Sequence, residues 1–393
     1  MNTHSAVNLT QSISWTDGEQ SHTALWRSER GVPPPKRVML ADDTLTADSA
    51  HRLACEGTAM LWRSDFQNAR QLLDALARRL DAAAKPSRKQ QAAAASLSPL
   101  DRFNRYRLAR SQRARTLGML LIELDADYQI ALRRAPDVAQ ACQQAWGPGK
   151  AASVASLREL LGVIGAYEWH KKGLAVPSLG EGVRIYPHYG VFAPVRSEYV
   201  DLVQQAPLAP SVTSAMDIGT GTGVLAAVLA RRGVATLVAT DQDPRALACA
   251  AENLLRLGLL PQVQLLSADL FPAAGSAPAE LIVCNPPWLP GRPASPIEQA
   301  IYDPQSRMLR GFIAGVSAHL APSGEAWLIL SDLAEHLGLR SRDELLALFS
   351  AAKLQVKGRI DTKPSHPKVH DANDPLHAAR AAEVCSLWRL VPS

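Results

Sequence analysis

Apolar residues recur along the chain with two different spacings. Between residues 48 and 165, leucines and other apolar residues come three or four positions apart with charged residues between them, as in amphipathic helices. The clearest of these predicted helices covers residues 66–84. From residue 213 onward, short apolar runs of strand length alternate with helical stretches. This alternation predicts an α/β fold with a doubly wound, mostly parallel sheet in the second half of the chain.

The α/β half divides into regular elements at its turn residues. The predicted strands are 215–218, 237–240, 263–266, 281–284, 326–330, 355–360 and 383–390, and the predicted helices are 224–231, 244–257, 307–319 and 342–351. A sheet of seven strands therefore accounts for the apolar runs of this half.

The whole chain is predicted to contain two domains and a linker. Residues 1–165 are interpreted as a helical, substrate-recognition domain whose start, up to the prolines at 33–35, is disordered or strap-like. Residues 166–200 alternate apolar and polar positions among several Gly and Pro residues, which predicts a hairpin linker. Residues 201–393 make the α/β domain.

Composition narrows the class of protein. The chain has 393 residues, 47% of them hydrophobic, which is enough for two buried cores. Its five cysteines lack the paired spacing of a zinc site or a disulfide scaffold. No apolar run approaches the ~18 residues of a membrane helix, and no signal-peptide pattern opens the chain. We therefore expect a cytoplasmic protein with no metal site and no membrane segment.

The positive charge is concentrated in the first part of the chain. Residues 1–150 hold 21 Lys or Arg against 15 Asp or Glu, whereas residues 151–393 hold 21 against 22. Six arginines lie between residues 102 and 115, with two aromatic residues among them. Arg105, Arg110 and Arg113 are candidates for contacts with the phosphates of a nucleic acid. A solvated helix face that pairs with the acids at 123–127 is the alternative explanation.

A glycine-rich segment between the first predicted strand and helix of the α/β half marks a cofactor site. It contains Asp217, Gly219, Thr220, Gly221 and Gly223. Glycines at such a turn let the backbone approach a ligand closely. The G-x-G-x-x-G spacing of dinucleotide-binding proteins is absent, since Val or Ala stands where a glycine is required. A nicotinamide-dependent oxidoreductase is therefore disfavoured.

Two further acids stand at the ends of the next two strands. Asp241 follows the second strand, where a carboxylate can bind a ribose diol, and Asp269 follows the third, near the place of an adenine. The segment 217–223 with these acids, in this order, resembles the class I S-adenosylmethionine-dependent methyltransferases. The resemblance implies S-adenosylmethionine as cofactor and a Rossmann-like, seven-stranded sheet whose last strand is antiparallel.

The candidate catalytic motif follows the fourth strand and consists of Asn285, Pro286, Pro287 and Trp288. Prolines remove backbone donors and leave carbonyl acceptors, so with the Asn285 amide oxygen the loop suits a planar NH2 group. This motif resembles the amino-methyltransferases of the same superfamily, which include adenine-N6 and guanine-N2 enzymes acting on nucleic acids and the HemK-like release-factor glutamine methyltransferases. The resemblance implies that Asn285 is the catalytic acceptor, beside the cofactor, and that Trp288 holds the target. Asp303, shortly after the loop, either adds a carboxylate to the site or caps the helix near residue 307.

The identity of the substrate stays open among several classes. The segment 193–196 reads Ala-Pro-Val-Arg where HemK-like enzymes carry Pro-Arg-Pro, and residue 288 is Trp where they usually carry Tyr. We therefore expect a macromolecular substrate, with RNA or another nucleic acid favoured over a protein glutamine and over a small amine. A non-catalytic protein that binds the cofactor or a partner is the alternative from another class. The sequence does not indicate an oligomeric state.

Overall fold

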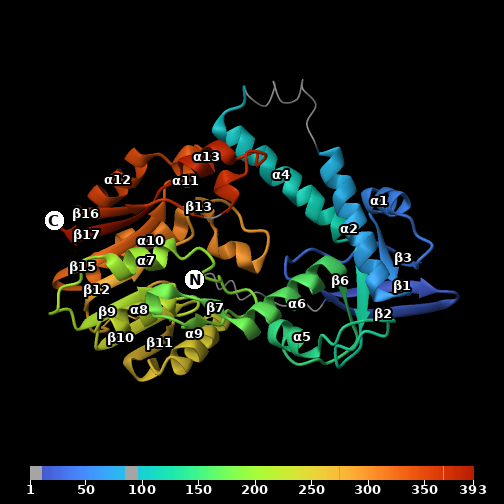
Figure 1. The fold of residues 1–393 in the computed structure, drawn as a ribbon, viewed down its shortest axis with the longest axis horizontal. Coiled ribbons are helices and arrows are strands. Elements are labelled where there is room, and N and C mark those ends of the chain that lie inside the picture. Colours follow the sequence, from blue (N-terminus) through green and yellow to red (C-terminus); the bar gives the residue numbers. More distant parts are fainter. Residues whose placement is uncertain (1–10, 85–95, 274, 366) are drawn as a thin grey trace. The chain divides into compact units, whose positions relative to one another are not determined.

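The computed structural model describes residues 11–84, 96–273, 275–365 and 367–393 of the chain (Figure 1). The chain divides into two compact units. Unit 1 comprises residues 1–96 and 105–168, and unit 2 comprises residues 97–104 and 169–393. The short segment 97–104 therefore belongs to unit 2, although it is remote in sequence from the rest of that unit.

Unit 1 is built on a six-stranded mixed sheet, so the prediction of a helical first domain is wrong. The strand order is β1-β2-β6-β5-β4-β3. The strands are β1 (Ser12–Asp17), β2 (Gln20–Arg27), β3 (Arg37–Ala41), β4 (Thr58–Trp62), β5 (Leu120–Leu124) and β6 (Ser153–Ser156). Because β1 and β2 pair as an antiparallel hairpin, the predicted strap-like start is also wrong for these residues.

Unit 1 also contains helices, one of which, α2 (Phe66–Ala83), corresponds to the predicted helix 66–84. They are α1 (Ala47–Cys55), α2 (Phe66–Ala83), α5 (Ala139–Trp146), most of α4 (Pro99–Leu117) and most of α6 (Leu157–Lys172). Helix α2 begins where the Asp65 side chain accepts a hydrogen bond from the Gln67 N–H at 2.9 Å, and it buries Leu72, Leu73 and Leu76. Strand β4, in contrast, is buried over 59–62, and a short, uniformly apolar run does not distinguish a strand from a helix.

Unit 2 contains the predicted seven-stranded sheet in the order β11-β10-β9-β12-β15-β17-β16. The strands are β9 (Ser214–Ile218), β10 (Thr236–Asp241), β11 (Val263–Ser267), β12 (Ala279–Cys284), β15 (Leu320–Ser331), β16 (Leu354–Thr362) and β17 (Cys385–Pro392). Strand β17 is antiparallel to both of its neighbours, β15 and β16. The α/β fold class and the antiparallel last strand are confirmed.

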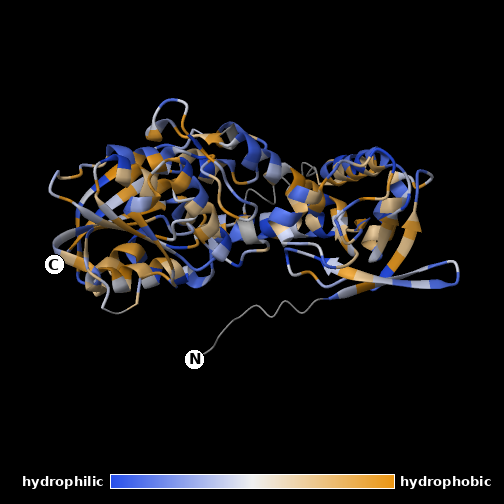
Figure 2. Ribbon diagram, turned by 90° about the horizontal axis from the view of Figure 1, so that it is seen from below, coloured by the Kyte–Doolittle hydropathy of each residue, from blue (hydrophilic) through white to orange (hydrophobic). Residues whose placement is uncertain are grey.

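Helices cover both faces of this sheet. They are α7 (Glu198–Gln205), α8 (Val224–Arg231), α9 (Pro244–Arg256), α10 (Arg307–Gly315), α11 (Leu333–His336), α12 (Arg342–Ala351) and α13 (His377–Ala382). Helices α7, α8 and α9 contribute to one core cluster, and α10 and α12 contribute to another. All residues 224–230 of α8 are buried, which explains why this helix is apolar on every side. Apolar residues, orange in Figure 2, accordingly concentrate on strands and on the inner sides of helices.

Shorter elements complete unit 2. Strands β7 (Leu174–Ala175) and β8 (Arg184–Ile185) are antiparallel and only two residues long, within the region predicted as a hairpin linker. Strands β13 (Leu289–Pro290) and β14 (Tyr302–Asp303) pair in parallel after the candidate catalytic motif. The short 3₁₀ helices are Pro177–Leu179, Leu260–Gln262, Pro296–Ala300, Pro304–Ser306, Val316–Ala318 and Pro367–His370. Among the described residues, no helix has the length and apolar character needed to cross a membrane.

Candidate active site

The glycine-rich loop after β9 lies at the carboxyl edge of the unit 2 sheet. The N–H groups of Gly219 and Thr220 both donate to the Thr240 carbonyl at 2.9 Å, which holds the loop against β10. Gly219 and Gly223 have φ angles of 75° and 78°, a region that residues with a side chain rarely adopt. The loop therefore needs glycine at these positions and leads directly into the N-terminus of α8.

Asp217 lies beneath this loop and is 1% exposed. Its Oδ2 atom accepts hydrogen bonds from the Thr220 hydroxyl at 2.7 Å and from the Ala226 N–H at 3.1 Å. Its Oδ1 atom is buried and has no hydrogen-bond partner among the described residues. Burial raises the pKa of Asp217 to about 6, although the hydrogen bonds from Thr220 and Ala226 oppose this change. An unsatisfied buried carboxylate oxygen suits a ligand that brings a donor or a positive charge.

Asp241 lies at the end of β10 beside the same loop. Its Oδ2 atom accepts a hydrogen bond from the Gly221 N–H and its Oδ1 atom one from the Asp243 N–H, each at 3.0 Å. Burial raises the pKa of Asp241, while these hydrogen bonds act in the opposite direction. Because β9 and β10 are adjacent and parallel, the structure brings Asp241, Asp217 and the glycine loop together.

Asp269 differs from these two acids. Its side chain is 55% exposed and forms an ion pair with Arg307 at the start of α10. The ion pair raises the pKa of Arg307. The sequence carried no signal for this arginine, which engages the carboxylate that was predicted to meet an adenine.

The candidate catalytic motif emerges from β12 next to the glycine loop. Cys284, the last residue of β12, is in register with Ile218, the last residue of β9, so Asn285 and Gly219 follow at the same sheet edge. Pro286 is buried and Pro287 is partly buried. The structure therefore brings the predicted catalytic and cofactor residues onto neighbouring strand ends.

Two contacts of Trp288 were not expected from the sequence. Its indole N–H donates to the Asn285 Oδ1 atom at 2.9 Å. The Arg196 guanidinium carbon lies 5.2 Å from the centroid of the indole ring. The partly buried ring also packs against core clusters on both faces of the sheet. Arg196 thus belongs to the site, although the sequence indicated only that it ends the segment before the glycine motif.

Asp303 caps helix α10 in the structure. Its two carboxylate oxygens accept hydrogen bonds from the N–H groups of Met308 and Leu309, each at 3.1 Å. The sequence left open whether Asp303 adds a carboxylate to the site or caps a helix, and these hydrogen bonds are those of a helix cap.

The candidate phosphate-binding arginines belong to unit 1, whereas the residues described above belong to unit 2. Arg113 makes a two-point ion pair with Asp81 at 2.8 and 3.0 Å, and not with the acids at 123–127. Arg110 donates to the Tyr106 hydroxyl at 3.0 Å. Arg105 is exposed. Phe103, one of the aromatic residues among these arginines, is buried and therefore does not face a ligand.

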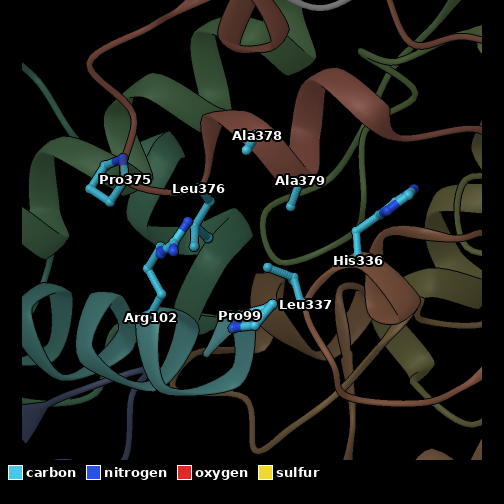
Figure 3. A pocket seen from close by; sticks show the side chains of 8 residues that line it. All are labelled: Pro99, Arg102, His336, Leu337, Pro375, Leu376, Ala378 and Ala379. Atoms are coloured by element: carbon cyan, nitrogen blue, oxygen red, sulfur yellow. The ribbon is translucent and has the colours of Figure 1, made fainter. Parts of the chain in front are cut away.

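Unit 2 also contains a cavity of about 240 Å³ between the start of α4, α11 and α13 (Figure 3). Its lining is mostly apolar, with a guanidinium from Arg102 and an imidazole from His336, and is completed by Pro99, Leu337, Pro375, Leu376, Ala378 and Ala379. None of the residues predicted to bind the cofactor or to act in catalysis lines this cavity.

One group of three side chains among the described residues has the spacing of metal ligands. It consists of His170, His188 and Glu252, whose ligand atoms lie within 4.8 Å of one another. Glu252 accepts hydrogen bonds from His188 at 2.6 Å and from the Arg256 guanidinium at 2.9 Å. Because Arg256 already balances its negative charge, hydrogen bonding explains this group, and the absence of a metal stays a prediction.

Comparisons with known proteins find methyltransferases. Residues 183–358 match the protein family described as the methyltransferase small domain. A release factor glutamine methyltransferase of Cereibacter sphaeroides is 35% identical over 145 residues, which cover 34% of this chain and 51% of that protein. A tRNA1(Val) (adenine(37)-N6)-methyltransferase of Shewanella loihica is 28% identical over 200 residues, which cover 48% of this chain and 79% of that protein.

Among solved structures, the chain is similar to the ribosomal protein L11 methylase from Lactobacillus delbrueckii subsp. bulgaricus. It has a TM-score of 0.35 and 17% identity, and the match covers 50% of this chain and 76% of that one. The chain spans about half the length of the release factor methyltransferase named above. The match to the methyltransferase small domain covers residues 183–358, and the resemblance to the class I S-adenosylmethionine-dependent methyltransferases is confirmed.

Proposed function

We propose that the protein is an S-adenosylmethionine-dependent methyltransferase that methylates a planar amino nitrogen of a base in RNA or another nucleic acid. The observation that carries this proposal is the place of Asn285, which follows β12 directly beside the glycine loop of β9. A methyl acceptor held by the Asn285 loop would therefore lie next to a cofactor held by the glycine loop.

Residues of unit 2 fit the cofactor. S-adenosylmethionine supplies a methyl group on a positively charged sulfonium, together with a protonated amino group. The buried Asp217 Oδ1 atom lacks a donor, and a cationic ligand would satisfy it. The Asp241 carboxylate, held by two backbone N–H groups, is oriented to accept hydrogen bonds from a ribose diol. Gly219, Gly221 and Gly223 all have positive φ, a conformation that favours glycine, and because glycine has no side chain the turn leaves room for a ligand.

The chain's own contribution to the reaction is to orient the target nitrogen. The Asn285 Oδ1 atom and the Pro286 carbonyl are hydrogen-bond acceptors, and a planar NH2 group has two hydrogens to donate. Donating both hydrogens aims the nitrogen lone pair out of the plane of the group. Correct placement and fixed dipoles supply the rate enhancement, with no metal required.

Two observations favour a nucleic acid as the substrate. The exposed Arg105 and the excess of 21 basic over 15 acidic residues in residues 1–150 suit a polyanion. The relative named as a tRNA adenine-N6 methyltransferase is matched over 79% of its length. A protein glutamine is the second candidate, because relatives named as release factor glutamine methyltransferases reach 36% identity over shorter regions.

The proposal is tested by transfer of labelled methyl groups from S-adenosylmethionine into the macromolecules of a strain that lacks the protein. Wild-type protein should label a fraction whose label is released by nuclease and not by protease. The Asn285→Ala variant should keep its cofactor affinity and lose most of this labelling. Label released only by protease would show that the substrate is a protein and not a nucleic acid. Absence of label from both fractions would contradict the methyltransferase function itself.

A further inference from the structure

The orientation of the Asn285 amide is set by the neighbouring indole. An amide side chain presents an acceptor on one side and a donor on the other, and only the acceptor suits a target NH2 group. The Trp288 indole N–H can donate a hydrogen bond but cannot accept one, and its nitrogen lies 2.9 Å from the Asn285 Oδ1 atom. Turning the amide over would place two donors against each other. Trp288 therefore holds the oxygen in place and leaves its second lone pair for a substrate.

Trp288 is in turn held by Arg196. The guanidinium carbon lies 5.2 Å from the ring centroid, within the range of a cation–π contact. Arg196 comes from the segment before α7, 92 residues away in the chain, and covers the indole with a planar cation. The ring is partly buried and also packs against both core clusters of unit 2, which limits its movement.

Two buried carboxylates lie beside Arg196, one of them hydrogen-bonded to it and the other at ion-pair distance. Its guanidinium donates to the Glu383 Oε1 atom at 3.1 Å, and Glu383 is 1% exposed. The same oxygen accepts a hydrogen bond from the Ser331 hydroxyl at 2.7 Å. Glu198 lies 3.8 Å from the Arg196 Nε atom, and its other carboxylate oxygen accepts a hydrogen bond from the Ser365 N–H at 2.9 Å. Buried charges are paired in this way because an unpaired one is costly.

We propose that Arg196 and Trp288 are positioning residues that hold the Asn285 carbonyl oxygen toward the target amine, and that Trp288 does so through its indole N–H. The inference rests on the proposed function, since it assigns the groups that orient its acceptor. It adds an orienting role to the target-holding role that the sequence predicts for Trp288.

The decisive variants separate the indole N–H from the aromatic ring. Trp288→Phe keeps a ring for stacking and removes the donor, so kcat should fall about tenfold while KM for the target stays within about twofold. Arg196→Met should lower kcat in the same way, and Arg196→Lys should recover part of it. Arg359→Lys is the matched control, because Arg359 also lies over an indole, that of Trp388 at 5.0 Å, and also pairs with an acid, Asp361. Unchanged kcat in Trp288→Phe, or a rise confined to KM, would overturn the proposal.

A second measurement does not depend on turnover. The chain has eight tryptophans, so protein labelled with ¹⁵N only in tryptophan gives eight indole signals. The Trp288 signal, identified by its loss in Trp288→Phe, should exchange slowly with solvent and should shift in both Asn285→Ala and Arg196→Met. A Trp288 signal that is insensitive to Asn285→Ala would contradict the hydrogen bond. An inactive wild-type protein with the expected shifts would instead contradict only the proposed function.

Discussion

Asp217 should make cofactor binding depend on pH. Its carboxyl group is 1% exposed, burial raises its pKa to about 6, and its Oδ1 atom has no partner among the described residues. The sulfonium and the protonated amino group of S-adenosylmethionine favour the ionised carboxylate. Binding should therefore strengthen as the pH rises through the pKa of Asp217, in the range where this carboxyl loses its proton.

The size of the effect follows from the pKa. With a pKa of about 6, roughly one carboxyl in eleven is ionised at pH 5 and roughly ten in eleven at pH 7, so the Kd should fall about tenfold over this range. An α-amino group has a pKa of ~7.7–8.0, so the cofactor's own charge changes little below pH 7. Asp217→Asn should bind more weakly at pH 7 and with a smaller dependence on pH. Burial also raises the pKa of Asp241, so the titration of Asp241 accounts for any pH dependence of the Kd that remains in this variant.

The same carboxyl should destabilise the cofactor-free protein at neutral pH. Its pKa is higher in the folded state, about 6, than its ordinary value of 3.8, so the unfolded chain releases the proton first as the pH rises. The free energy of unfolding should then fall between about pH 4 and pH 6, by on the order of 1–3 kcal/mol. Calorimetric titrations of wild type and Asp217→Asn with the cofactor at pH 5, 6 and 7 test the change in Kd. Urea unfolding of the same two proteins tests the change in the free energy of unfolding. Equal slopes of Kd against pH in wild type and Asp217→Asn would refute the reasoning.

Three further predictions concern other parts of the chain. Asn253→Ala should lower the free energy of unfolding by about 1–3 kcal/mol in urea titrations, because Asn253 is buried and bonds both the N–H and the carbonyl of Tyr186; a change below about 0.5 kcal/mol would contradict this. Chelation by EDTA should leave methyl transfer unchanged, since hydrogen bonds already satisfy Glu252. Activity that is lost with EDTA and restored by added zinc would show that the protein needs a metal. Arg105→Ala should weaken RNA binding and reduce the slope of log K against log salt by about 1, whereas an unchanged slope would exclude a phosphate contact.

The sequence was most informative where chemistry and strand ends coincide. Asp217, Asp241 and Asn285 stand at or just after the ends of three strands, and adjacent parallel strands bring such positions to one edge of the sheet. The order of motifs was therefore sufficient to predict that they meet. The predicted helix 224–231 has the bounds of α8, because a helix that is buried on all sides ends where the apolar run ends.

Features that depend on contacts between distant residues could not be read from local patterns. Strands β4 and β5 of unit 1 are short and mostly buried, and nothing in their spacing separates them from helical segments. The ion pair of Asp269 with Arg307 joins residues 38 positions apart. Asp303 illustrates a different case, because its place four residues before Arg307 indicated a helix cap, and the structure has one.

The aromatic residue at position 288 shows how a small departure from a motif changes its physical meaning. A tyrosine carries its hydroxyl at the far end of the ring, where it has no reach back to a residue three positions earlier. The N–H of an indole lies on the five-membered ring, close to the backbone, and from there Trp288 reaches the Asn285 Oδ1 atom at 2.9 Å. Arg196, which lies over the ring and is hydrogen-bonded to the buried Glu383, keeps the indole in this place. The kcat of Trp288→Tyr should therefore fall as far as that of Trp288→Phe, although tyrosine is the residue that related enzymes usually carry. Full activity of Trp288→Tyr would show that the aromatic ring alone suffices.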